Sequence, residues 1–352
     1  MRPGVSILIA VVSVAASLSP GALLGAAPSR LAELSSTEGV LRWINTYRGK
    51  PDPAGVPGAV GALSRLGAFK DPEQAGPYTG FVAGVIRSNP AKAPDLIGKM
   101  LPLPPGDEWV VVRAIAYSDH SDWRNLLRRF EDRMPSRKVM IDKYLLGELP
   151  TIWQNPPDKP SAWQTMRSYV TLDKLRGVEA PKEIALHQSP ELLDTYWGYY
   201  FATGTHRPIL RIVEMLPMSK NHDDIEKLTI GNMAKYSLAS NAARDPGLLG
   251  MLKQAREYSS SEAVPVLNEV IEAAETVETS RLRREALAAL DELKRKGPES
   301  RRNMSFWGQV GQGAIAVGCI AASATGHIEL GIPCVIGGGV SSAALGFWDK
   351  QP

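Results

Sequence analysis

Two short polar clusters contain the residue types that support metal binding or acid–base catalysis. They are residues 119–122 (Asp-His-Ser-Asp) and residues 222–224 (His-Asp-Asp). Imidazole nitrogens and carboxylate oxygens bind divalent metals, and a His–Asp pair can exchange protons with a substrate. Both clusters fall where a helix is expected to begin, and Asp and Ser at such positions ordinarily cap free backbone N–H groups. We therefore expect these clusters to cap helices, and we expect no metal site and no cofactor.

Other catalytic signatures are weak or missing. Residues 311–316 match the G-x-G-x-x-A dinucleotide pattern, and Glu329 follows at a suitable distance. No strand is expected before this motif and only 23 residues follow Glu329, so a βαβ unit cannot be built around it. The sequence also lacks an H-E-x-x-H motif, a Walker A lysine loop and a G-x-S-x-G elbow. Both cysteines lie in the apolar tail, which argues against a thiol nucleophile.

Four segments of the chain share the layout of a helix, a short polar turn and a second helix. Their apolar residues recur at helical spacing, and Ser, Asn, Asp and Gly gather at the turns. Pro208 and Pro246 are placed where a second helix would begin, a position that tolerates the missing N–H. The aromatic run at 196–201 (YWGYYF) is expected to be core, with Gly198 allowing close helix contact; an aromatic groove is the alternative. The segments are 78–101, 109–130, 194–216 and 230–252, with turns at Asn89, Asp119, Gly204 and Asn241.

This layout resembles the α-solenoid group of helical-repeat proteins, TPR-like and HEAT-like. Two turn spacings, 30 and 37 residues, lie in the range of such repeats, whereas the third, 85 residues, does not. The TPR consensus is absent from every hairpin, so only the architecture carries over. The resemblance implies an all-α, irregular α-solenoid over residues 27–302. Because stacked hairpins form an extended concave face, it also implies a protein-binding role.

Residues 149–190 interrupt the helical pattern. The segment contains six prolines and two β-like runs, at 168–172 and 183–186. Long irregular segments within compact domains are commonly functional or disordered. We expect an irregular insertion with a small β-hairpin, which would serve as a lid, a docking loop or a spacer. The prolines are Pro150, Pro156, Pro157, Pro160, Pro181 and Pro190.

The C-terminal segment, residues 303–352, is apolar and rich in glycine. Glu329 is its only formal charge before Asp349, and it lies near the midpoint. Each half is about twenty residues, and a helix of that length spans roughly 30 Å, the thickness of a bilayer core. Aromatic pairs at both ends suit a membrane–water interface. The tail therefore predicts a helical hairpin that enters a membrane and returns. The aromatic pairs are Phe306-Trp307 and Phe347-Trp348.

Small residues recur every four positions on each predicted arm. In lipid, helices associate where small residues let their backbones approach, so the two stripes predict a tight antiparallel pair. Helical rise places Cys319 and Cys334 at depths that differ by roughly 3–6 Å. That offset allows a strained disulfide between the arms, and two buried thiols are the alternative. The stripes are Ala314, Gly318, Ala322 and Gly326 on the first arm, and Gly338, Ser342 and Gly346 on the second.

The segment just before the tail is basic, which bears on whether the tail contacts membrane lipid. Residues 281–302 contain eight Lys or Arg and four Asp or Glu, a net charge of +4, and basic flanks attract anionic lipid head groups. A solvated helix face explains the same charges. Against insertion, both arms are only moderately apolar, and the basic flank would lie on the exported side. A soluble hairpin buried in an oligomer or against the helical body is the competing interpretation.

The first residues predict export. A basic start, an uncharged apolar run at 5–18 and small residues through Ala27 match a secretory signal over residues 1–26, with an uncleaved anchor as the alternative. A net charge of +3 over 352 residues does not indicate nucleic acid as a partner. We expect an exported, non-enzymatic, protein-binding scaffold held to the periplasmic side of a bacterial-type membrane. The alternatives are an enzyme with a site between the helical body and the 149–190 insertion, and a secreted, self-assembling, membrane-inserting factor.

Overall fold

The computed structural model describes residues 34–154, 189–221 and 224–276, and within them the chain forms twelve α-helices and no strand. The expectation of an all-α body is confirmed for these residues. The first group of helices is α2 (Thr37–Thr46), α3 (Val56–Arg65), α4 (Gly76–Ser88), α5 (Ala93–Met100), α6 (Glu108–Tyr117), α7 (Trp123–Phe130) and α8 (Lys138–Leu146). The second group is α10 (Pro190–Thr203), α11 (His206–Val213), α12 (Ile225–Ala242), α13 (Pro246–Ala255) and α14 (Ala263–Glu275).

The four predicted hairpins are present. Helices α4 and α5 flank Asn89, and α6 and α7 flank Asp119. Gly204 ends α10 in the left-handed conformation (φ 66°), and its N–H donates to the carbonyl of Tyr200. The fourth turn lies slightly later than predicted, because α12 continues to Ala242. Asn241 is still helical there and donates from its side chain to the carbonyl of Ser237 at 2.9 Å.

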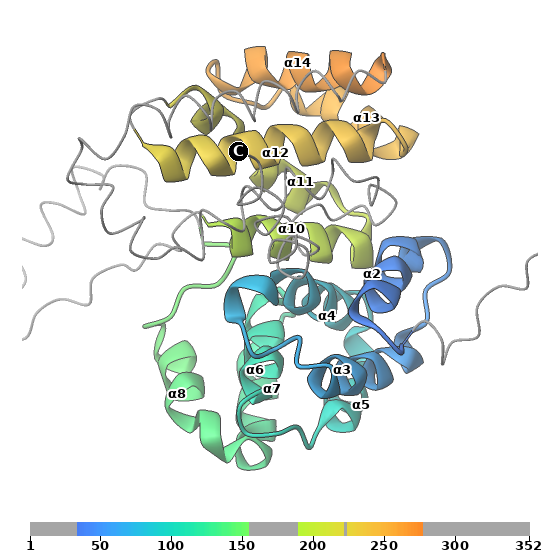
Figure 1. The fold of residues 1–352 in the computed structure, drawn as a ribbon. Coiled ribbons are helices and arrows are strands. Elements are labelled where there is room, and N and C mark those ends of the chain that lie inside the picture. Colours follow the sequence, from blue (N-terminus) through green and yellow to red (C-terminus); the bar gives the residue numbers. More distant parts are fainter. Residues whose placement is uncertain (1–33, 155–188, 222–223, 277–352) are drawn as a thin grey trace, which may run out of the picture.

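Helix α10 is the member of the second group that packs against the first group (Figure 1). Its main partner is α4, although the two helices are separated in the chain by α5 to α8 and by residues 155–188. On its other side lie α11 and then α12, and both α13 and α14 pack on the far side of α12 (Figure 1). The two groups of helices are therefore joined through α10.

Helices α4 and α10 touch backbone to backbone. Three glycines recur every four residues on α4, and Gly198 faces them from α10. A Cβ atom at Gly80 would lie 1.9 Å from the carbonyl oxygen of Thr195, and one at Gly198 would lie 2.0 Å from that of Pro77. No side chain fits at these distances, so glycine is required at both positions. The prediction that Gly198 allows close helix contact is confirmed. The stripe on α4 is Gly76, Gly80 and Gly84.

The aromatic run on α10 is core. Trp197 and Tyr200 are fully buried, and Tyr196, Tyr199 and Phe201 are each 4% exposed. The polar tips of the run find partners on other elements: the Trp197 indole N–H donates to Ser237 Oγ at 3.0 Å, and the Tyr196 hydroxyl donates to the carbonyl of Ile152 at 2.8 Å. Burial with these bonds explains why the run forms core and not an open groove.

An ion pair connects the segment after α2 to the start of α13, and Tyr200 of α10 bonds to both of its members. Arg48 follows α2; its Nη2 donates to Asp245 Oδ2 at 2.5 Å and its Nη1 donates to the Tyr200 hydroxyl at 2.6 Å. The Tyr200 hydroxyl donates in turn to Asp245 Oδ2 at 2.9 Å, and Asp245 Oδ1 accepts from the N–H of Leu248, which caps α13. Burial raises the pKa of the Asp245 carboxyl, but the bonds from Arg48, Leu248 and Tyr200 outweigh it. The pKa of Asp245 therefore lies below its ordinary value.

Several predicted features lie outside the described residues. These are the export signal, the two β-like runs, both cysteines, the basic flank and the whole tail. At the end of the predicted insertion, Ser189 caps α10 and Pro190 is the first residue of that helix. Among the described helices, none combines the length and the apolar character needed to cross a bilayer.

The contact between α4 and α10 predicts that Gly80→Ala lowers the free energy of unfolding by about 3 kcal/mol, because the added methyl group must push the two backbones apart. Urea denaturation followed by far-UV circular dichroism measures the change. Gly61→Ala in α3 is the matched control. The nearest atom to its Cβ is the Arg65 guanidinium at 3.5 Å, so it is expected to stabilise by about 0.5–1 kcal/mol. Equal effects of the two substitutions would contradict the contact.

The lowered pKa of Asp245 predicts a pH-dependent loss in Asp245→Asn. Asn caps a helix as well as Asp does, so the variant mainly removes the charge that faces Arg48. Stability from a lowered pKa is present above the unfolded value, about 4, and is lost as pH falls through the folded value. We expect the variant to be about 1 kcal/mol less stable at pH 7, and the difference to close below about pH 4.

Asp95→Asn is the control for this measurement. Asp95 pairs with Lys99 on an exposed helix face, so its loss is expected to stay under about 0.5 kcal/mol at pH 7. Thermal unfolding between pH 3 and pH 7 compares the two variants with the parent protein. A difference for Asp245→Asn that is independent of pH would show that the carboxylate charge does not contribute to stability.

Candidate functional site

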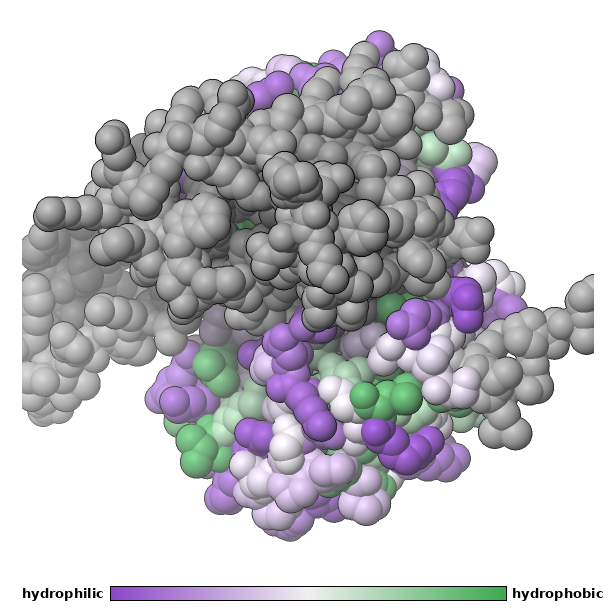
Figure 2. All heavy atoms as spheres, viewed as in Figure 1, coloured by the Kyte–Doolittle hydropathy of each residue, from purple (hydrophilic) through white to green (hydrophobic). Residues whose placement is uncertain are grey.

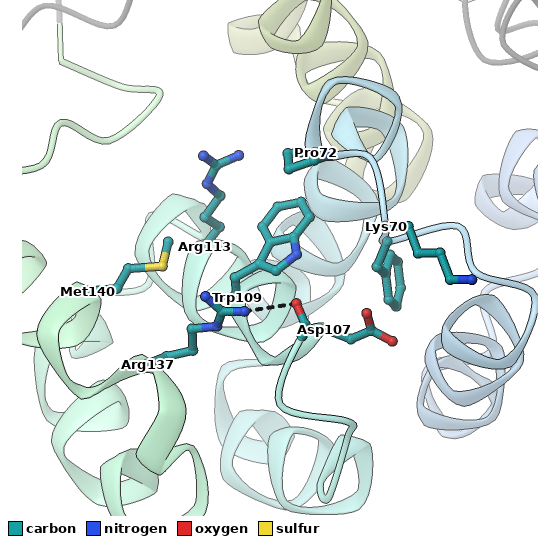
Figure 3. A pocket seen from close by; sticks show the side chains of 9 residues that line it. Lys70, Pro72, Asp107, Trp109, Arg113, Arg137 and Met140 are labelled. Carbon is teal, nitrogen blue, oxygen red and sulfur yellow. Dashed lines mark hydrogen bonds between the residues drawn. The ribbon is translucent and has the colours of Figure 1, made fainter.

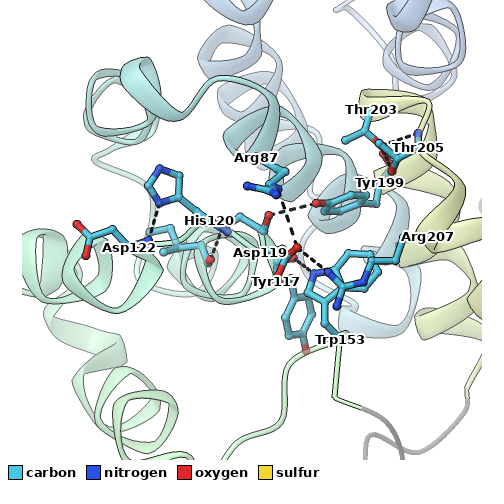
Figure 4. A network of polar contacts seen from close by, with 12 residues as sticks. Arg87, Tyr117, Asp119, His120, Asp122, Trp153, Tyr199, Thr203, Thr205 and Arg207 are labelled. Atoms are coloured by element: carbon cyan, nitrogen blue, oxygen red, sulfur yellow. Dashed lines mark hydrogen bonds and ion pairs between the residues drawn. The ribbon is translucent and has the colours of Figure 1, made fainter.

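The first predicted polar cluster lies in the turn between α6 and α7 and faces α4, α10 and α11 (Figure 4). Asp119 Oδ2 accepts a hydrogen bond from Arg207 Nη1 at 2.6 Å and lies 3.9 Å from Arg87 Nε. The Asp119 side chain is 37% exposed and both arginine side chains are 49% exposed. One carboxylate thus bridges cations from α4 and α11. At this exposure the bridge orients the elements and adds little stability.

The backbone of Asp119 is left-handed, with φ 56°. Apart from glycine, Asp and Asn are the residues that adopt this conformation most readily. The turn brings the carbonyl of Ser118 to 3.2 Å from the Tyr199 hydroxyl, which donates to it. Asp119 therefore shapes the turn with its backbone as well as with its carboxylate.

His120 is 9% exposed, and its ring supports the start of α7. Nδ1 accepts the backbone N–H of Asp122 at 3.0 Å, which places the proton of the neutral ring on Nε2. Nε2 is buried and makes no hydrogen bond within the described part of the chain. Asp122 holds the N-cap position, but its Oδ1 accepts from the Asn125 side chain at 2.5 Å and not from a backbone N–H. The cluster serves a helix start, as predicted, but the histidine and not the aspartate accepts the backbone bond.

The second predicted cluster is described only at Asp224, since residues 222 and 223 lie outside the described residues. Asp224 Oδ1 accepts the N–H of Lys227 at 3.1 Å at the start of α12. The capping role predicted for this aspartate is confirmed. His206 is exposed as the first residue of α11, whereas His120 is buried, and His187 lies outside the described residues. Within the described ranges, no three His, Cys, Asp or Glu side chains are grouped as a metal ion requires.

Trp153 is a member of this network that the sequence pattern did not reveal. Its indole N–H donates to the carbonyl of Tyr117 at 2.8 Å, and the Arg207 guanidinium lies 4.3 Å from its ring centroid (Figure 4). Its ring also meets Tyr199 edge-on at 4.8 Å. A tryptophan inside a proline-rich segment was the only available signal. The network joins α4, α6, α10, α11 and the loop after α8, so its contacts hold these elements together.

A second candidate is an open pocket of about 450 Å³ on the first group of helices (Figure 3). It is formed by the loop after α3, the loop before α6, the first turns of α6, and the start of α8. In Figure 3 the ring of Trp109 lies at the centre, with Arg113 and Arg137 on one side and Lys70 on the other. The lining residues are Phe69, Lys70, Pro72, Gly106, Asp107, Trp109, Arg113, Arg137 and Met140.

The charges of the pocket lining are three cations and one carboxylate. Arg113 pairs with Glu191 of α10 and stacks on Trp109, with 4.8 Å between its guanidinium carbon and the ring centroid. Burial lowers the pKa of Arg113, but Tyr117 and Glu191 outweigh it, so that the pKa lies above its ordinary value and the side chain stays charged. Arg137 Nη2 donates to the carbonyls of two loop residues at 2.9 Å each. The pocket is thus basic and preformed, and it was not predicted from the sequence.

Comparisons of the chain with protein-family models, with curated proteins and with solved structures each gave no match.

The turn geometry predicts an order of stability among three variants of Asp119. Asp119→Asn keeps a residue that tolerates the left-handed backbone and loses only exposed charge pairs, so we expect a loss of about 0.5 kcal/mol. Asp119→Ala adds the cost of a left-handed alanine, about 1–2 kcal/mol more. Asp119→Gly is expected to lie between the two. Urea denaturation measures all three, and an Ala variant as stable as the Asn variant would contradict a backbone role.

Proposed function

We propose that this chain is an exported, non-enzymatic helical scaffold that binds a protein partner and is attached to a membrane by its C-terminal hairpin. In this proposal the stacked hairpins form an irregular α-solenoid. The tail at 303–352 and the basic flank before it contact membrane lipid on the periplasmic side of a bacterial-type membrane.

The proposal that the chain is not an enzyme is supported by the contacts of residues 119–122. These residues form one of the two polar clusters whose side chains could take part in catalysis or metal binding. Asp119 is bridged by two arginines, and His120 accepts a backbone N–H through Nδ1. A general base must reach a substrate proton, and a metal ligand must have a free lone pair. The lone pair of His120 and the carboxylate of Asp119 are both committed to holding elements together.

A binding role is supported by the surface of the first group of helices. The pocket around Trp109 is preformed, and α8, which supplies Met140 to its wall, also carries Val139 and Leu146 with 70% and 73% of their surface exposed. These two residues are seven positions apart and so share one face of the helix. Figure 2 shows apolar side chains at the surface in this region. An exposed apolar face beside a polar pocket is typical of an interaction surface.

Membrane attachment is supported by the sequence of the tail, whose single formal charge between Arg302 and Asp349 is Glu329. Two arms of about twenty residues with aromatic ends match the thickness of a bilayer. The small-residue stripes suit close packing of the arms in lipid. They are also compatible with an oligomer.

Deleting residues 303–352 tests the attachment. We expect the full chain, expressed with its N-terminal segment in a bacterium, to sediment with membranes through a high-salt wash and to leave them only in detergent. The deletion variant is expected in the soluble periplasmic fraction with unchanged helical circular dichroism. High salt separates insertion from attraction through the basic flank alone, since exposed charges are screened. Full-length protein that stays in the soluble fraction would contradict the anchor.

A further inference from the structure

The residues that line the pocket around Trp109 include hydrogen-bond donors that the described chain leaves without partners. Arg137 Nε is buried and makes no hydrogen bond among the described residues. The Trp109 indole N–H and the Lys70 ammonium group also have no hydrogen-bond or ion-pair partner within these ranges. Trp109 is only 7% exposed, so its N–H is held in place by the packing of its ring. Of these donors only Arg137 Nε is buried, and a buried donor without a partner costs free energy that a bound acceptor would recover.

The acceptors in and beside the pocket are already occupied. Asp107, the only carboxylate in the lining, accepts from the Ser64 hydroxyl at 2.5 Å. The neighbouring Glu108 is 5% exposed and accepts from the Ser136 hydroxyl. Glu191 is paired with Arg113. The free capacity of the pocket is therefore to donate hydrogen bonds, chiefly from Arg137, Trp109 and Lys70, since Arg113 is paired with Glu191.

The remaining lining is apolar. Phe69, Pro72 and Met140 form walls beside the ring of Trp109. A volume of about 450 Å³ holds a carboxylate together with one apolar group. The complementary ligand is an anion with two oxygen acceptors next to an apolar body, since arginine and indole N–H groups recognise carboxylate oxygens.

We propose that this pocket binds an acidic peptide segment of the partner protein, with a Glu or Asp carboxylate directed at Arg137 and Trp109 and an adjacent apolar side chain against Phe69 and Met140. A peptide fits better than a free small acid because the exposed apolar face of α8, at Val139 and Leu146, lies on the helix that forms one wall. A ligand that extends beyond the pocket can cover this face. The inference rests on the proposed protein-binding function and adds the chemistry of the partner.

Fluorescence anisotropy with two synthetic peptide pools tests the inference on the full chain. Both pools have random flanks; one has a central Leu-Glu pair and the other a central Leu-Gln pair. We expect the Glu pool to bind at least about tenfold more tightly, the usual size of a charge-assisted hydrogen bond. Equal binding of the two pools, or no binding of either, would overturn the inference.

Three pocket variants and one control assign the binding to this site. Arg137→Gln is expected to weaken binding of the Glu pool about tenfold, Trp109→Phe about fivefold and Lys70→Gln about threefold. Lys92→Gln changes an exposed lysine outside the lining and is expected to change nothing. Arg137 also bonds to two loop carbonyls, and Trp109→Phe keeps an aromatic ring but loses part of the buried indole together with its N–H. Unchanged far-UV circular dichroism and unchanged urea unfolding of each variant therefore guard against misfolding. Undiminished binding by both Trp109→Phe and Arg137→Gln would place the peptide elsewhere.

Competition with phenylacetate separates the two sources of a carboxylate. We expect this free acid to displace the Glu pool only at concentrations about a hundredfold above the dissociation constant of the pool, because it lacks the peptide contacts along α8. Displacement at equal concentration would identify a small acid and would overturn the peptide. The peptide pools are measured without membranes, so the two proposals are tested separately. Equal binding of the two pools would not affect the result of membrane fractionation. Loss of membrane attachment would not affect the preference for the Glu pool.

Discussion

The contact between the backbones of α4 and α10 is the constraint on which the rest of the structure depends. Cβ atoms at Gly80 and Gly198 would overlap carbonyl oxygens of the facing helix, so the two axes can approach this closely only with glycine. Close approach of this kind is supported by dispersion contacts along both backbones. It also fixes the rotation of α10 about its own axis, because Gly198 must face α4. That rotation decides where each aromatic side chain of the helix points.

Three separate features are positioned by this one helix. Glu191, in its first turn, pairs with Arg113 beside the pocket. Tyr199 reaches the turn that contains Asp119, and Tyr200 reaches the ion pair of Arg48 with Asp245. The pocket around Trp109, the polar network around Asp119 and the ion pair of Arg48 with Asp245 thus all depend on the position of α10. A helix that positions three features in this way can hold a preformed surface, which agrees with the proposed binding role.

Local patterns in the sequence located the eight helices of the four hairpins, α4 to α7 and α10 to α13, but did not predict which helices pack together. Apolar periodicity and turn residues such as Gly204 located the hairpins, and Gly198 indicated a close contact, because each of these signals acts within a few residues. The pairing of α4 with α10 spans more than a hundred residues, and a glycine stripe does not name the helix that it will meet. The basic pocket was missed for the same reason, since Lys70, Trp109 and Arg137 come together only through the fold. Trp153 gave no periodic signal at all.

Native-state hydrogen exchange measures the central contact most directly. If the α4–α10 contact holds the two groups of helices together, the amides of Gly76–Ser88 and Pro190–Thr203 exchange together, at the rate set by global unfolding. Helices at the edges, such as α8 and α14, are then expected to exchange faster, through local opening. Exchange of α10 with the fast edge helices while α4 stays protected would show that the two helices do not form one cooperative unit, and would contradict the account.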